Sequence, residues 1–168
     1  MNAPEPIAPA RDDELAEAPF VVTRPPPEVT HRPLVFASPH SGRIYPAGMM
    51  AASRLDARAI RRSEDAFMDR LIEAAPAHGA SVIAARFARA YVDLNREAWE
   101  LDPGMFEDEL PPYARGRSAR VAAGLGAIAR VVRQGEEIYA RKLTFEEART
   151  RVEAVHRPYH EALGALVE

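Results

Sequence analysis

The sequence predicts an α/β fold in which helices pack on a central sheet. Three observations support this class: a short apolar run at 34–38, a segment at 55–78 with apolar residues at helical spacing, and a second apolar run at 81–85. Short apolar runs bounded by turn-forming residues are typical of buried strands, whereas a spacing of three or four residues marks one face of a helix. A strand, a helix and a strand in this order begin an α/β sheet.

The first 32 residues are predicted to precede the folded domain. They are rich in Pro, including Pro25-Pro26-Pro27, and show neither helical nor alternating apolar periodicity. Segments of this composition bury little apolar surface and tend to stay extended. We therefore expect a Pro-rich tail or extended lead-in over residues 1–32 and one α/β domain over residues 33–168.

The elements that follow are expected in a regular order. The first strand is expected at Leu34–Ser38. From about Leu55 to His78 the apolar residues recur at helical spacing, and Gly79 is a suitable C-terminal stop for a helix. Two short strands should come next, at Ser81–Ala85 and Ala90–Leu94.

The second half of the chain is less regular until Thr144. Leu101–Pro112 mixes Pro, Gly and acidic residues and is expected to be a long loop. Val121–Val132 is apolar but interrupted by glycines, so it is expected to be strand or loop. Thr144 and Glu147 have the spacing of a capping box, which predicts a helix from there to the last residue. Pro158 lies inside this helix and should bend it.

Composition limits the functions that the chain can serve. The chain has 168 residues, a formal net charge of -3 and no Cys. It lacks the basic excess of a nucleic-acid-binding protein, and no apolar run approaches the roughly 20 residues of a membrane span. These features predict a cytoplasmic protein that binds neither nucleic acid nor membrane, and they leave open whether it forms a homo-oligomer. Without Cys, a metal ion would be held by His and carboxylate groups.

His40 stands at the end of the first predicted strand and is followed by Ser41 and Gly42. Open α/β proteins keep their active sites at the ends of strands, so this imidazole is a candidate metal ligand. A structural histidine followed by a simple turn is the alternative explanation.

Glu64 and Asp65 are the second group of candidates. If the helix is continuous, Glu64 falls in its apolar stripe, where an unpaired carboxylate is costly and should meet a cation. If the helix begins near Ala66 instead, Asp65 becomes its N-cap. A metal ligand, an Arg-paired acid and an N-cap are therefore the three open explanations.

Asn95 and Arg96 stand together at the end of the last predicted strand of this region. A guanidinium offers a bidentate fork to a carboxylate and the amide adds a neutral donor, so the pair suits recognition of a small acid. An ion pair of Arg96 with Glu97 or Glu100 is the alternative. Together with His40, these residues indicate a hydrolase with an anionic substrate.

His156 and His160 stand four residues apart on the predicted C-terminal helix, a spacing that places two ligands on one face. No Glu accompanies them as in metalloproteases, and Pro158 lies between them. A surface helix is therefore the preferred explanation.

Five motifs occur in order from about Leu34 to the last residue: Pro39-His40-Ser41-Gly42-Arg43 with Tyr45-Pro46, Glu64-Asp65-Ala66-Phe67-Met68-Asp69, Arg89-Ala90-Tyr91-Val92-Asp93-Leu94-Asn95-Arg96, Gly135-Glu136-Glu137-Ile138-Tyr139, and Arg157-Pro158-Tyr159-His160. In this order they resemble the N-formylglutamate amidohydrolase family. The resemblance implies a metal-dependent hydrolase of linear amides that cleaves N-formyl-L-glutamate, or a similar small anionic N-acyl amino acid, to formate and glutamate in histidine degradation. It also implies the mixed sheet flanked by helices of the related zinc carboxypeptidases and aspartoacylases.

The resemblance further implies zinc, or another divalent metal. His40 would be its first ligand and Asp65 the carboxylate ligand, with Glu64 as the alternative. The family continues to an Asp-Cys-His-Ser segment, which would supply a further His ligand, and to a catalytic Glu. We therefore expect a fold and a metal site that are incomplete at the C-terminus. A truncated, non-catalytic relative that binds an acidic ligand or a partner chain is the alternative.

The same resemblance assigns substrate contacts. Asn95 and Arg96 match a pair that grips the substrate carboxylate, and Ser41 is expected to contact the substrate as well. Arg89 is expected to be catalytic, by polarising the carbonyl or by binding the second carboxylate. Asp93 would orient these groups.

Overall fold

The computed structural model describes residues 18–133 and 135–168, and its centre is a mixed three-stranded sheet. The strands, in the order β1-β3-β2, are β1 (Phe20–Thr23), β2 (Val35–Ser38) and β3 (Ser81–Ala85). β2 runs parallel to β3, and β1 runs antiparallel to it. The strands expected at 34–38 and 81–85 are therefore confirmed, and so is the mixed sheet.

β1 lies within the segment expected to be a tail or lead-in, so that expectation is wrong for residues 20–23. The four residues alternate between half-buried and exposed positions, a pattern too short to stand out between prolines. Val22 pairs with the buried Ile83, whereas Val21 is about half exposed. The rest of the expected tail, residues 1–17, lies outside the described residues.

The helix expected over 55–78 is broken into three short helices: η2 (Ile60–Ser63), α2 (Met68–Leu71) and η3 (Ala75–His78). Phe67 has a left-handed conformation with φ of 66°, which ends any continuous α-helix. The N–H of Asp65 donates to the carbonyl of His40 at 3.1 Å instead of to a helical partner. Gly79, with φ of 93°, ends the last of these helices as predicted.

The strand expected over Ala90–Leu94 is a buried loop. The N–H of Tyr91 donates to the carbonyl of Ala88 at 2.9 Å, and the N–H of Asp93 donates to the carbonyl of Ala127 at 2.8 Å. Neither bond belongs to a sheet. The apolar side chains of this loop are nevertheless buried in the core, which explains why the segment has the composition of a strand.

Short elements make up the middle of the chain: α1 (Ala47–Ala52), η4 (Pro103–Met105), η5 (Pro112–Ala114), α3 (Ala119–Ala122), β4 (Val131–Arg133) and β5 (Glu136–Glu137). The loop expected over Leu101–Pro112 contains the short helix η4 and the first residue of η5. The segment expected to be strand or loop at Val121–Val132 begins within α3 and ends in β4, so its first two residues are helical. β4 pairs antiparallel with β5.

The C-terminal helix begins where the capping box predicts. The Thr144 hydroxyl accepts from the N–H of Glu147, and the Glu147 carboxylate accepts from the N–H of Thr144. The helix consists of three consecutive parts: α4 (Phe145–Arg151), the π-helical segment η6 (Val152–His156) and α5 (Arg157–Val167). Pro158 stands in the first turn of α5, so the disturbance expected there takes the form of the π-helical segment that precedes it.

Arg151, the last residue of α4, is buried and anchors the helix to the core. Its Nη1 donates to the carbonyl of Tyr91 at 3.2 Å and to the hydroxyl oxygen of Tyr139 at 2.6 Å. The guanidinium also lies over the ring of Tyr91, 4.7 Å from its centroid. Such contacts are stronger where water is excluded, so α4 is firmly tied to the loop that follows β3.

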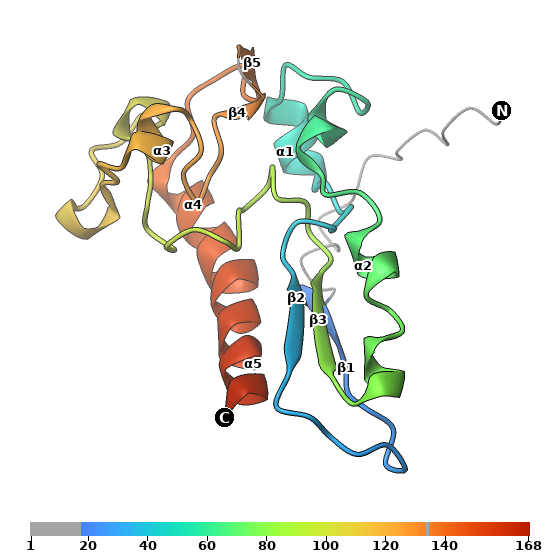
Figure 1. The fold of residues 1–168 in the computed structure, drawn as a ribbon. Coiled ribbons are helices and arrows are strands. Elements are labelled where there is room, and N and C mark those ends of the chain that lie inside the picture. Colours follow the sequence, from blue (N-terminus) through green and yellow to red (C-terminus); the bar gives the residue numbers. More distant parts are fainter. Residues whose placement is uncertain (1–17, 134) are drawn as a thin grey trace, which may run out of the picture.

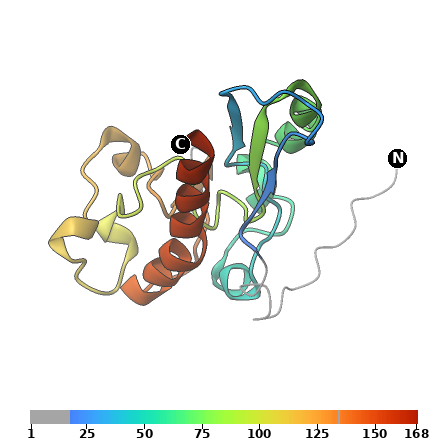
Figure 2. The ribbon, with the colours of Figure 1, turned by 90° about the horizontal axis from the view of Figure 1, so that it is seen from below.

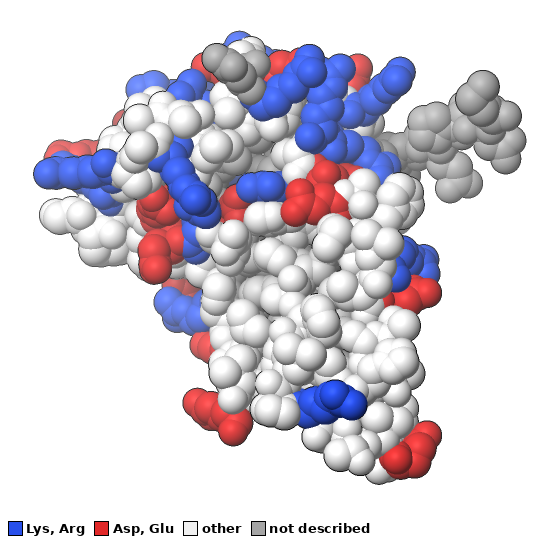
Figure 3. All heavy atoms as spheres, viewed as in Figure 1, with Lys and Arg blue, Asp and Glu red and all other residues white. Residues whose placement is uncertain are grey.

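Helices cover both faces of the sheet. α5 lies against one face and α2 against the other, as Figure 1 and the rotated view in Figure 2 show. Phe20 of β1 packs edge-to-face on Tyr159 of α5, with ring centroids 6.1 Å apart. Charged side chains gather over α1 and the β4–β5 end of the molecule, whereas the surface over β2 and α5 carries few of them (Figure 3).

The helices are short. In the part of the chain that the structure describes, none has the length and apolarity needed to cross a membrane.

Candidate active site

Gly42 allows the turn after β2 to approach the turn after β3. The N–H groups of Arg43 and Ile44 both donate to the carbonyl of Arg86, at 2.8 and 2.9 Å. A Cβ added at Gly42 would lie 2.0 Å from the carbonyl oxygen of Phe87, so a residue with a side chain could not take this place without moving the backbone. The motif that contains His40 thus needs its glycine for packing.

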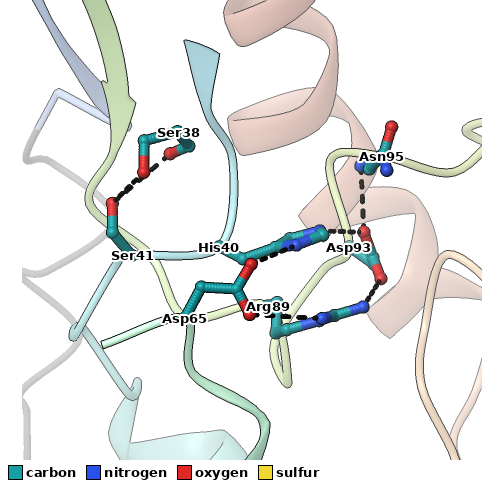
Figure 4. Close-up of polar contacts among 7 residues, drawn as sticks. All are labelled: Ser38, His40, Ser41, Asp65, Arg89, Asp93 and Asn95. Atoms are coloured by element: carbon teal, nitrogen blue, oxygen red, sulfur yellow. Dashed lines mark hydrogen bonds and ion pairs between the residues drawn. The ribbon is translucent and has the colours of Figure 1, made fainter. Parts of the chain in front are cut away.

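The His40 side chain is buried and contacts two carboxylates (Figure 4). Its Nε2 lies 2.7 Å from Oδ1 of Asp93, and its Nδ1 lies 3.3 Å from Oδ2 of Asp65. An ionised carboxylate can only accept a hydrogen bond, so the shorter contact requires a proton on Nε2. In the neutral ring, Nδ1 then carries the lone pair and faces Asp65.

Arg89 joins the same two carboxylates. Its Nη2 donates to Oδ2 of Asp93 at 2.8 Å, and its Nη1 lies 3.8 Å from Oδ1 of Asp65. His40, Asp93, Arg89 and Asp65 therefore form a closed ring of polar contacts, which we call the His40 ring (Figure 4). With a neutral imidazole the His40 ring has two carboxylates and one guanidinium, so its net charge is negative and favours an added cation.

Asp93 is the buried carboxylate of the His40 ring. Burial raises the pKa of its carboxyl, but the contacts with His40 and Arg89 outweigh burial and lower the pKa to about 2. Its Oδ1 also accepts from the backbone N–H of Asn95 at 2.9 Å. Asp93 therefore stays ionised and holds the imidazole in one orientation.

Asp65 is the accessible carboxylate of the His40 ring, with its side chain 51% exposed. The residue at the N-cap position of α2 is Phe67, and no side chain caps this helix, so the N-cap explanation for Asp65 is wrong. The backbone bond between Asp65 and His40 instead docks the segment before α2 onto the end of β2. The carboxylate is left available to a ligand.

The carboxylate of Glu64 forms hydrogen bonds with residues outside the His40 ring. Its Oε1 accepts from the hydroxyl of Tyr45 at 2.6 Å, and its Oε2 accepts from Nη2 of Arg61 at 3.1 Å. Burial and the contact with Glu64 raise the pKa of Tyr45, so the phenol keeps the proton that it donates. The expectation that a cation meets Glu64 is confirmed, and Asp65 is the carboxylate beside His40.

The residues predicted to bind substrate are only partly brought together. The hydroxyl of Ser41 accepts from Ser38 at 2.8 Å and is directed to Ser38 rather than into the His40 ring (Figure 4). Asn95 joins the ring through its backbone N–H. Arg96 is the next residue, and in the described structure no ion pair joins it to Glu97 or Glu100. The structure thus brings the backbone of Asn95 and Arg96 to Asp93, but neither residue lines the cavity, and Ser41 is not part of the ring.

Two histidines that the sequence did not connect with the site hold the loop carrying Asp93. Nε2 of His156 lies 2.8 Å from the carbonyl oxygen of Arg96, and Nε2 of His160 lies 2.8 Å from that of Leu94. Since a carbonyl can only accept, both rings donate. His156 is buried, so the surface-helix explanation is wrong for this residue. The four-residue spacing reveals a shared face, but it does not reveal what that face contacts.

A cavity of about 290 Å³ lies beside the His40 ring. Asp65, Arg89 and Asp93 contribute to its polar lining. Its apolar lining comes from Ala90, from Leu125 and Ala129 before β4, and from Val131 and Val132 of β4. A cavity of this size with mixed lining suits a small polar molecule with a short apolar part.

His40 and Asp65 could hold two positions of a metal site. In a neutral imidazole with its proton on Nε2, Nδ1 and the Oδ2 atom of Asp65 would both be acceptors, and a cation shared between them would stabilise their separation of 3.3 Å. With bonds of about 2.0–2.1 Å, two ligands of a tetrahedral zinc ion stand roughly 3.3–3.4 Å apart, in agreement with this separation. Residues 18–133 and 135–168 contain no group of three His, Cys, Asp or Glu suited to a metal ion. The described residues therefore offer a pair of ligands rather than a complete set.

Comparison with known proteins identifies the family of this chain. The N-formylglutamate amidohydrolase family matches residues 32–168. The crystal structure of N-formylglutamate amidohydrolase from Ralstonia eutropha JMP134 is similar to 90% of this chain, with a TM-score of 0.82 and 37% sequence identity. The chain spans 52% of that protein's length. A comparison with curated proteins finds no match. Because the family match covers most of the sequence, the chain belongs to the N-formylglutamate amidohydrolase family.

Proposed function

We propose that this chain takes part in hydrolysis of the formyl amide of N-formyl-L-glutamate, which yields formate and glutamate. The observation that supports the proposal is the His40 ring beside a small-molecule cavity, in a chain that belongs to this family. The substrate class is a small anionic N-acyl amino acid. The proposed setting is histidine degradation, as the motifs imply, in the cytoplasm, as the composition predicts.

The proposed reaction uses a divalent metal ion, with zinc as the first choice. Nδ1 of His40 and the carboxylate of Asp65 would hold it, while Asp93 keeps the proton on Nε2. When bound, zinc supplies a Lewis acid for the formyl oxygen and a water whose pKa is lowered to about 7. The expected relation of this family to the zinc carboxypeptidases and aspartoacylases supports the same choice.

Arg89, Asn95 and Arg96 are the proposed substrate contacts. Arg89 lines the cavity, and its guanidinium has more donors than its contact with Asp93 uses. It would donate to the formyl oxygen and stabilise the negative charge that develops there during attack. Asn95 and Arg96 would bind the α-carboxylate and hold the amide against the His40 ring.

A second candidate is a non-catalytic relative that binds an acidic ligand or a partner chain. One observation favours it: the described residues offer no group of three His, Cys, Asp or Glu suited to a metal ion. The same cavity would then bind the acid without cleaving it.

Formate release from N-formyl-L-glutamate tests the two candidates. We expect formate release that a chelator abolishes and added zinc restores, and that His40→Ala eliminates. His31→Ala is the matched control, because it removes an exposed histidine outside the His40 ring. If zinc-loaded protein binds N-formyl-L-glutamate but releases no formate, the hydrolase proposal is contradicted and the second candidate is supported.

A further inference from the structure

Arg62 is a second arginine in the cavity beside the His40 ring. It lines this cavity together with Arg89. Its side chain is 43% exposed, and its Nη1 donates to Oε1 of Glu136 at 2.5 Å. A guanidinium has several donors in a planar fork, so this single contact leaves others for a ligand.

Glu136 holds Arg62 without cancelling the positive charge. The same Oε1 atom accepts from Nη2 of Arg133 at 2.6 Å, so two arginines share one carboxylate. These contacts lower the pKa of Glu136, which keeps it ionised, and the three side chains together are net positive. Arg62 belongs to the cavity lining and Arg133 does not. The cavity is also lined by the carboxylates of Glu64, Asp65 and Asp93, which contact Arg61, Arg89 and His40. Arg62 is therefore the guanidinium of the lining that is not paired with a lining carboxylate.

The rest of the cavity suits the side chain of an acidic amino acid. Leu125 lines it although 39% of this residue is exposed, so the cavity has an accessible apolar surface against which methylene groups can pack.

We propose that Arg62 binds the side-chain carboxylate of the substrate and thereby selects dicarboxylic over monocarboxylic N-acyl amino acids. The inference rests on the proposed function, in which the His40 ring acts at the formyl group and Asn95 and Arg96 bind the α-carboxylate. Arg62 is then the cation in the cavity that remains for the third polar group.

The test compares N-formyl-L-glutamate with N-formyl-L-glutamine, which has nearly the same shape without the side-chain charge. Dissociation constants are measured by calorimetry on the zinc-loaded protein, and formate release is measured separately. The unmodified protein should prefer N-formyl-L-glutamate by about 10- to 100-fold, the size expected for a hydrogen bond between charged groups. Arg62→Gln should lose this preference by weakening N-formyl-L-glutamate binding, while Arg62→Lys should retain part of it.

Arg133→Gln is the matched control, because it removes the other arginine on Glu136 and leaves the cavity lining unchanged. It should keep the preference, and thermal unfolding should show that all variants are folded. The inference is overturned if Arg62→Gln keeps the preference, if Arg133→Gln loses it equally, or if the unmodified protein has none. Preferential binding without formate release contradicts the proposed function alone, whereas formate release with an unchanged preference in Arg62→Gln contradicts this inference alone.

Discussion

Nε2 of His40 lies 2.7 Å from Oδ1 of Asp93, although 53 positions separate the two residues in the chain. His40 follows β2, and Asp93 lies in the loop after β3. Parallel pairing of the two strands places these ends side by side. Pairing alone does not fix the loop, which the carbonyl contacts of His156 and His160 hold in place.

Asp93→Asn should lower zinc affinity about 10- to 100-fold. An amide can donate to Nε2, which favours the tautomer with its proton on Nδ1 and removes the lone pair that faces Asp65. Competition with a chromogenic chelator measures the affinity. Asp69→Asn is the control, because Asp69 pairs with Arg43 outside the His40 ring. An equal loss in both variants would contradict the role given to Asp93.

Gly42→Ala should destabilise the protein by about 2–3 kcal/mol and weaken zinc binding. The added Cβ would lie 2.0 Å from a backbone oxygen of Phe87, and relief requires the two turns to separate. Urea unfolding measures the loss. Gly48→Ala in α1 is the matched control: a Cβ there has nothing within 4 Å, so alanine should stabilise the helix by about 0.5–1 kcal/mol. Unchanged stability of Gly42→Ala would show that the turn is not constrained.

Glu147 should make stability fall in acid. Its hydrogen bond with Arg141 lowers its pKa from 4.5 to about 2, aided by the N–H of Thr144 and opposed by burial. Because the pKa is lower in the folded state, the ionised group stabilises the fold above about pH 4.5, and this contribution is lost as the pH falls toward about 2. Glu147→Gln should lower the free energy of unfolding by about 1 kcal/mol at neutral pH. Near pH 2 the same substitution should have almost no effect. Urea unfolding at several pH values measures both.

The control for this prediction is Glu153→Gln. Glu153 forms an exposed i,i+4 pair with Arg157, and such pairs contribute about 0.3–0.5 kcal/mol. A constant loss in Glu147→Gln at every pH would mean that the capping contact does not depend on the ionised carboxylate.

Phe67→Gly should be more stable than Phe67→Ala by about 1 kcal/mol. At φ of 66° a residue with a Cβ is strained, by roughly 1–2 kcal/mol. Inside an α-helix the order would be reversed. Both variants lose the ring whose centroid lies 5.7 Å from the Arg43 guanidinium carbon, so that contact cancels in the comparison. Thermal unfolding of the two variants measures the difference in stability. A more stable Phe67→Ala variant would argue against the left-handed conformation at this position.

Local signals predicted part of the fold. β2, β3 and the Thr144 capping box depend on neighbouring residues, and these predictions are confirmed. The break at Phe67 depends on the bond between the Asp65 N–H and the His40 carbonyl, which periodicity cannot reveal. The loop Ala90–Leu94 is apolar because it is buried, not because it pairs with a strand.

The site, like the fold, could be predicted only in part from the sequence. His40 and Asp65 could be proposed as neighbours because several motifs occur in the order of a known family. Ser41 belongs to the same motif as His40, but its spacing does not show that the hydroxyl turns to Ser38. Arg62 carries no sequence signal, since arginine is abundant throughout the chain, and only the cavity distinguishes it.

The C-terminal helix contacts the core both before and after the π-helical segment Val152–His156. The number of residues in this segment fixes the directions in which the side chains on its two sides point. Before it, Arg151 contacts Tyr91 and Tyr139; after it, His160 continues the carbonyl contacts begun by His156. A helix turns by about 100° per residue, and a π-helical turn accommodates one residue more than an α-helical turn. Deleting a single residue from the segment would preserve a helix but turn one anchor away from its partner. The length of this helix is therefore constrained as well as its composition, and a one-residue deletion should harm the site more than a substitution at an exposed position nearby.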